Sequence, residues 1–308
     1  MVIRKISYYR VIVSLCLFMF LLSPVFGDEI SAVSFDKELP ENNIVTIQPD
    51  SLRILHNPLT GWVLYASMGV DAADFWAQYD HMYIPELGHN VSVTDYAHTL
   101  YIRASWTDFN PQEDVYGWKI DSNLRAYIEG AYQRNMRLAF RVVVDSRDKR
   151  TEFTPQFVKD AGAKGFMNKG KWSPYSDDSV FQKYYTKFVK ALAKDFNDPS
   201  KVEFIDGFGL GKWGEYHTMI YSTGDDTSKK AVFDWVTDIY SQAFDKVPVV
   251  INYHRWIGAG KDWVDDEHFA ADSEEMLEEA IKKGYSLRHD AFGMTTYYGS
   301  WERRFAKK

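Results

Sequence analysis

The sequence contains almost no cysteine, since Cys16 is the only one among its 308 residues. A disulfide framework and a zinc site built from several thiolates are therefore excluded. The sequence also lacks an excess of basic residues, with 36 Lys and Arg against 43 Asp and Glu and a net charge of −7. Proteins that bind nucleic acid or anionic membrane surfaces are usually basic, so neither is an expected partner.

A long hydrophobic run is missing as well. The apolar run Val11–Leu22 is shorter than the roughly 20 residues that a membrane-spanning helix needs. Basic residues precede this run and small residues follow it, which predicts a signal peptide over residues 1–27, cleaved before Asp28. An uncleaved membrane anchor and a lipid attached at Cys16 are the alternatives. We expect an exported bacterial protein, periplasmic, at the cell surface or extracellular, with no transmembrane segment after cleavage.

The mature chain would have 281 residues and no cysteine, so a cysteine nucleophile is excluded too. Cleavage removes three basic residues and no acidic one, which leaves a net charge of −10. What the sequence has in abundance is aromatic residues, at 16 % of the chain with 10 Trp. Sugar-binding clefts use such rings to stack on pyranoses, whereas the alternative is that the rings fill the core.

Short β-rich runs alternate with longer helical stretches from residue 57 onward, after a polar surface leader over residues 28–56. This order predicts an α/β fold with a parallel sheet. The predicted strands are Trp62–Ala66, Thr99–Ser105, Arg137–Val144, Val202–Phe208, Val247–Tyr253 and Leu287–Met294. Spacings of three and four residues and capping residues predict helices over Asp121–Asn135, Asp178–Phe196, Thr227–Phe244 and Asp272–Lys283.

Six such units fit either an open doubly wound sheet or a TIM-type (β/α) barrel. Long polar segments rich in aromatic residues follow the strands, and barrel enzymes carry their chemistry on the loops at these strand ends. We therefore predict a (β/α) barrel over residues 57–308. Because eight strands close such a barrel, we expect this one to be truncated after strand six, with its C-terminal units missing.

The segment after the fourth predicted strand contains the most informative motif, Gly209-x-Gly211-x-x-Gly214. It matches a dinucleotide-binding fingerprint in form, but it lies in the fourth unit and continues into bulky polar residues. We interpret the glycines instead as bends that turn Trp213, Glu215 and His217 toward a cleft. Glu215 between Trp213 and Tyr216 has a partly dehydrated setting, which suits a general acid; a surface glutamate is the alternative.

Further polar and aromatic residues end or follow the other strands, so we expect them to lie at the same end of the predicted barrel, around its opening. The predicted substrate-binding residues are Arg103, Trp106, Arg141, Asp145, Trp213, His217, Tyr253, His254 and Asp290. Arginines inside apolar strands are costly unless paired, so Arg103, Arg141 and Arg288 are expected to pair with carboxylates. The candidate partners are Glu215, Asp145, Asp206 and Asp290. A purely structural ion network is the alternative.

These residues also carry a resemblance to a known family. The motifs are Asn57-Pro-Leu-Thr-Gly-Trp62, Tyr101-Ile-Arg-x-Ser-Trp106-x-Asp-x-x-Pro111, Tyr116-Gly-Trp118, Ala139-Phe-Arg-Val142 and Gly211-x-Trp-Gly-Glu-x-His217. They resemble a family of secreted bacterial barrel proteins of unknown function, which in turn is similar to the retaining clan A of (β/α)₈ glycoside hydrolases. The resemblance implies that Glu215, after strand four, is the acid/base, and it places the nucleophile after a seventh strand.

We therefore expect a glycoside hydrolase-like protein of the retaining type that acts on a poly- or oligosaccharide. A non-catalytic carbohydrate-binding protein on the same fold is the alternative. No cofactor and no metal are expected, because a metal-dependent hydrolase using His217, His254 and His289 would lack His-x-His or His-Glu-x-x-His spacing.

Overall fold

The computed structural model describes residues 61–66, 68–145, 147, 151–252, 257–260 and 272–288. These residues belong to the unit Ile54–Lys308. The predicted signal peptide and the predicted surface leader lie outside the described residues. No helix of the described part is both long and apolar enough to cross a membrane.

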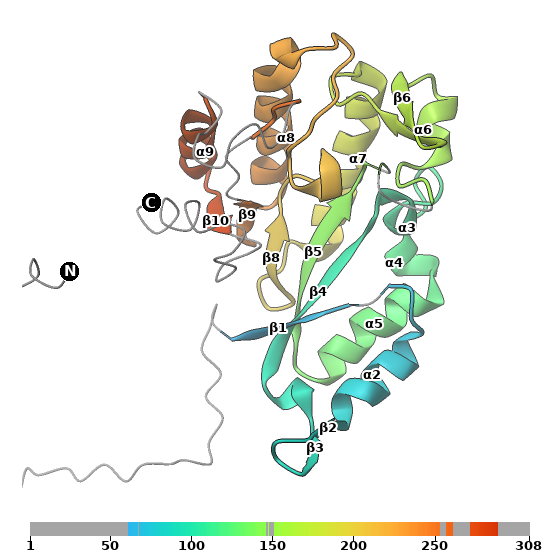
Figure 1. Cartoon of the computed structure of the whole chain (residues 1–308), viewed down its shortest axis with the longest axis vertical. Coiled ribbons are helices and arrows are strands. Elements are labelled where there is room, and N and C mark those ends of the chain that lie inside the picture. Colours follow the sequence, from blue (N-terminus) through green and yellow to red (C-terminus); the bar gives the residue numbers. More distant parts are fainter. Residues whose placement is uncertain are drawn as a thin grey trace, which may run out of the picture. The chain divides into compact units, whose positions relative to one another are not determined.

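One parallel sheet of six strands organises the described residues and curls into half of a barrel (Figure 1). Its order is β1-β4-β5-β8-β9-β10, so strands that follow one another among these six are neighbours. The strands are β1 (Trp62–Tyr65), β4 (Ala97–Ser105), β5 (Arg137–Val143), β8 (Val202–Asp206), β9 (Val249–Asn252) and β10 (Ser286–Arg288). The predicted α/β class and parallel sheet are confirmed, and β1 and β10 are the two edges of the sheet among the described residues.

Helices follow the strands and cover the convex face of the sheet. The four predicted helices are found as α5 (Ser122–Gln133), α7 (Ser179–Phe196), α8 (Lys229–Ala243) and α9 (Ser273–Lys282). The Asp121 and Asp178 side chains accept hydrogen bonds from Leu124 N and Phe181 N and so cap α5 and α7.

Several short elements were not predicted. The helices among them are α2 (Ala72–Asp80), α3 (Trp106–Phe109), α4 (Gly117–Ile120) and α6 (Gln156–Asp160). Two antiparallel hairpins pair β2 (Met82–Ile84) with β3 (His89–Val91) and β6 (Gly165–Asn168) with β7 (Lys171–Pro174). The segments after β4 and β5 therefore contain regular structure where the sequence predicted loops.

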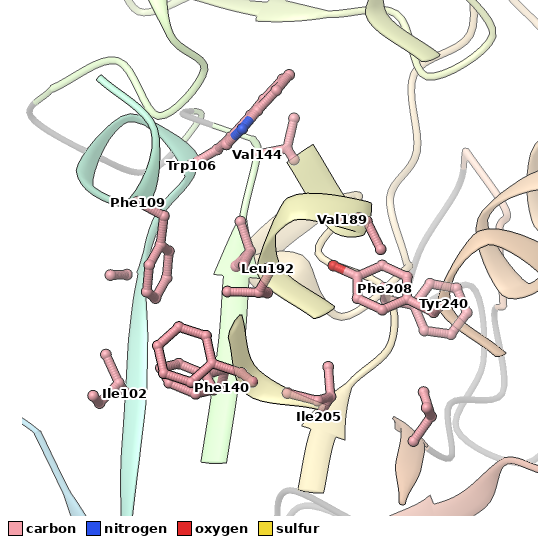
Figure 2. Packing of buried hydrophobic residues seen from close by; sticks show 14 of the residues in the cluster. Ile102, Trp106, Phe109, Phe140, Val144, Val189, Leu192, Ile205, Phe208 and Tyr240 are labelled. Atoms are coloured by element: carbon pink, nitrogen blue, oxygen red, sulfur yellow. The ribbon is translucent and has the colours of Figure 1, made fainter. Parts of the chain in front are cut away.

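Alternation along the strands separates an apolar face from a polar one. Ile102 of β4, Phe140 of β5 and Ile205 of β8 are buried in the core between the sheet and the helices, where Leu192 of α7 meets them (Figure 2). The neighbouring positions, such as Tyr101 and Arg141, point to the concave face of the curled sheet. The core thus fixes the strand register that brings the polar side chains together.

Candidate active site

The concave face of the sheet carries a pocket of about 450 Å³. Side chains from the five strands β1, β4, β5, β8 and β10 line it together with one residue of the loop after β8. The lining residues are Val63, Tyr65, Tyr101, Arg103, Arg141, Phe204, Glu215 and Arg288. Three guanidinium groups, one carboxylate and three aromatic rings therefore face one space, a combination suited to a polar ligand with a flat face.

Asp206, the last residue of β8, forms the buried centre of the ion network beneath this pocket. Its Oδ2 accepts hydrogen bonds from Tyr101 Oη at 2.5 Å, Arg141 Nε at 3.1 Å and Arg288 Nη1 at 2.6 Å. Burial alone would raise the pKa of Asp206, but the two guanidinium groups outweigh it and lower the pKa below the ordinary value. Burial and the neighbouring Asp206 charge raise the pKa of Tyr101, so its hydroxyl stays protonated and donates.

Glu215 lies at the carboxyl-terminal end of β8, after the 3₁₀ turn Lys212–Gly214. Its Oε1 is 3.0 Å from Arg141 Nη1, and 15 % of its side chain is exposed. Arg141 thus joins the buried Asp206 to Glu215, which opens onto the pocket. The expected contact between Glu215 and Arg141 is confirmed, and a carboxylate held at the strand ends and reachable from the pocket can exchange a proton with a bound molecule.

The loop that holds Glu215 has an unusual backbone. Gly209, Gly211 and Gly214 have positive φ, as the interpretation of these glycines as bends requires. Trp213, Tyr216 and Thr218 also have positive φ, which non-glycine residues seldom adopt and β-branched residues avoid. Such strain persists only where the surroundings impose it, and it gathers at functional sites.

Tyr216 anchors the loop to the core. Its ring is fully buried, with its centroid 4.3 Å from that of Phe208 and 5.8 Å from that of Phe233. Its backbone N–H donates to Leu210 O, and its carbonyl accepts from Gly258 N. Because Glu215 directly precedes this anchor, its carboxylate is held in place beside Arg141.

Replacing Gly209 by Ala tests how tightly the loop is held against the sheet. A Cβ atom at Gly209 would lie 2.2 Å from the Val142 carbonyl oxygen, whereas one at Gly224 would meet nothing within 4 Å, and both glycines have positive φ. We expect Gly209→Ala to lower the free energy of unfolding by about 2–3 kcal/mol, and the matched Gly224→Ala by about 1 kcal/mol, the conformational cost alone. Urea unfolding measures both, and equal losses would contradict the close approach.

His217 is a buried residue of the same loop and contacts Glu215, Trp213 and Thr218. It is fully buried, its Nε2 is 3.7 Å from Glu215 Oε2, and its Nδ1 shares a hydrogen bond with Thr218 Oγ1. Its ring also contacts the ring of Trp213 edge-on, at 5.5 Å between centroids. The structure therefore places His217 where it can orient Glu215, although its side chain does not line the pocket.

The other predicted site residues divide into three groups. Arg103 and Arg141 line the pocket, whereas Trp213 does not line it but contacts Arg103, whose Nη2 donates to the Trp213 carbonyl oxygen at 2.8 Å. The expectation of a carboxylate partner is confirmed for Arg141 and Arg288. Arg103 has no carboxylate partner among the described residues, and its Nη2 binds that backbone oxygen instead. Tyr253, His254 and Asp290 lie outside the described residues.

Two residues predicted to bind substrate occupy structural positions instead. Trp106 is fully buried among rings of α7, so the expectation that it faces the mouth is wrong. Asp145 is also buried and pairs with Arg147, with its Oδ2 2.6 Å from Arg147 Nη2. Both side chains hold the segment after their strand in place by packing or pairing with it. The position of a residue at a strand end does not predict such a structural role.

Some pocket residues were not predicted, namely Val63, Tyr65, Tyr101 and Phe204. The period of two along a strand would have found one of them, because Tyr101 shares a face with Arg103. Among the described residues, no group of three or more His, Asp or Glu side chains has the arrangement of a metal site.

Comparisons with known proteins give only distant similarities. No protein-family model and no curated protein sequence match the chain. Xylanase B from Clostridium stercorarium F9 is 14 % identical at a TM-score of 0.41, over 73 % of this chain and 59 % of that one. Endo-glycoceramidase II from Rhodococcus sp. is 12 % identical at a TM-score of 0.41, over 79 % and 62 %. This chain therefore spans about three-fifths of the length of each solved chain.

Proposed function

We propose that this chain is a glycoside hydrolase-like protein that acts on an oligo- or polysaccharide outside the cytoplasm, with Glu215 as general acid/base. One observation carries the proposal: Glu215 stands at the carboxyl-terminal strand ends, joined to Arg141, and opens onto a pocket lined by aromatic rings. In the proposal, the curled sheet is part of a TIM-type barrel, whose chemistry takes place at these strand ends.

The proposed mechanism uses Glu215 first as an acid and then as a base. Its carboxyl group gives a proton to the glycosidic oxygen as the C–O bond breaks, while a second carboxylate bonds to the anomeric carbon. The Glu215 carboxylate then takes a proton from the water that displaces this second carboxylate from the sugar. Arg141 stabilises the negative charge that appears on Glu215 in the first step. Tyr65 and Phe204, which line the same pocket, offer faces for the sugar ring.

A second candidate function is carbohydrate binding without hydrolysis. A glycosidase needs two carboxyl groups, about 5–5.5 Å apart in a retaining enzyme. Among the described residues that line the pocket, Glu215 is the single carboxylate. The second acid of the hydrolase would have to come from residues outside the described part.

Incubating the purified protein with a panel of polysaccharides tests both functions. We expect reducing ends to be released from at least one polysaccharide, together with binding of that polysaccharide in affinity electrophoresis. Binding without release would favour the second candidate. Neither binding nor release across the panel would contradict both functions.

A further inference from the structure

The described residues that line the pocket carry more positive than negative charge. Arg103, Arg141 and Arg288 line it, while Glu215 is its one lining carboxylate among the described residues. Beneath the pocket, the buried Asp206 supplies a second negative charge, and Arg141 and Arg288 both bind its Oδ2. Within the described part of the chain, three guanidinium groups therefore face two carboxylates, in a chain whose net charge is −7.

The surplus cation is Arg103 of β4. Its Nη2 donates to the Trp213 carbonyl at 2.8 Å, and no carboxylate of the described residues lies within ion-pair distance of it. The side chain is half-buried and faces the pocket. The bond to Trp213 fixes the orientation of the guanidinium plane, and the remaining N–H groups stay available to a ligand.

A partly buried guanidinium group that has no carboxylate partner among the described residues gains a favourable ion pair when an anion binds to it. Arginine binds carboxylates and sulfates well because its planar group makes two parallel hydrogen bonds. The aromatic faces of Tyr65 and Phe204 line the same pocket, so the ligand that fits is a ring that bears the anion.

We propose that Arg103 selects a sugar with an anionic substituent, either the carboxylate of a uronic acid or a sulfate ester. This inference rests on the proposed function, because it names the substrate class of the same pocket. It makes Arg103 a specificity-determining residue: Glu215 acts on the glycosidic bond, and Arg103 holds the acidic group of the sugar ring.

The test compares acidic oligosaccharides with neutral ones of the same linkage. The full-length protein is titrated by calorimetry with uronate-containing oligosaccharides, with the same oligosaccharides after reduction of the carboxyl groups, and with sulfated oligosaccharides. We expect an acidic form to bind about tenfold to a hundredfold more tightly than its neutral counterpart. Whether uronate or sulfate binds more tightly identifies the anion.

Variants of Arg103 then attribute the preference to this residue. Arg103→Gln keeps an N–H donor for the Trp213 carbonyl but removes the charge, and we expect it to abolish the preference, so that acidic and neutral oligosaccharides bind with equal affinity. Arg103→Lys keeps the charge and should retain part of the preference. Arg125→Gln, on the exposed side of α5, is the matched control and should leave every affinity unchanged.

The outcomes separate this inference from the proposed function. Equal binding of acidic and neutral forms, or an equal loss of both in Arg103→Gln, would overturn the inference. If a neutral oligosaccharide is also hydrolysed in that case, the proposed function stands. Preferential binding of acidic forms that are never cleaved would support the inference and favour the binding protein over the hydrolase.

Discussion

Replacing Glu215 by Gln is expected to reduce turnover of a cleaved polysaccharide at least a hundredfold while leaving its binding nearly unchanged. General acid catalysis contributes about 10²–10⁴-fold, and an amide cannot donate or accept the proton at the pH of the reaction. Gln keeps the size of the side chain and an oxygen that Arg141 can bind. The measurements are kcat from the release of reducing ends and Kd from calorimetry.

Glu129→Gln is the matched control for this change, because Glu129 lies on the exposed face of α5, where it pairs with Arg125. We expect kcat and Kd of this variant to equal those of the wild type. Unchanged turnover in Glu215→Gln would assign the proton transfer to another residue. Loss of binding together with turnover would instead make Glu215 a group that recognises the sugar.

The strands and the long helices could be predicted because one repeated signal defines each of them. The buried side chains of helix α7 show spacings of three and four residues, and Asp178 caps its N-terminus. The hairpin β6–β7 could not be found this way, since its strands have four residues each. Asn168-Lys169-Gly170 marks its turn, with Lys169 and Gly170 at positive φ, and is the signal that could have identified it.

The candidate site was predictable only in part, for a similar reason. Glu215 follows a predicted strand and three glycines in the sequence, and this order indicated its place at the strand ends. Whether a side chain at a strand end turns inward or outward depends on packing across long sequence distances. Trp106 illustrates this, because its burial against Tyr185 and Phe188 of α7 depends on residues about 80 positions away.

The ion network around Asp206, beneath the pocket, is expected to contribute strongly to stability. We expect Asp206→Asn to lower the free energy of unfolding at neutral pH by about 3–5 kcal/mol, because removing one partner of a buried ion pair leaves the other charge uncompensated. Here Arg141, with 3 % of its side chain exposed, would lose the buried charge of Asp206 and keep its contact with the more exposed Glu215. Urea unfolding measures the loss. Asp160→Asn, at an exposed position of α6 where Asp160 accepts one hydrogen bond from Gln156, should change stability by less than about 0.5 kcal/mol.

The pH dependence of this loss follows from the pKa of Asp206, which lies below its ordinary value in the folded protein because the attraction of Arg141 and Arg288 outweighs burial. A carboxyl group with a lowered pKa contributes stability above its unfolded pKa, and this contribution disappears as the pH falls through the folded pKa. The stability difference between wild type and Asp206→Asn should therefore be largest near neutral pH and shrink in acid, as far as the wild type stays folded. A difference that stays constant with pH would mean that the loss comes from packing and hydrogen-bond geometry rather than from the charge of Asp206.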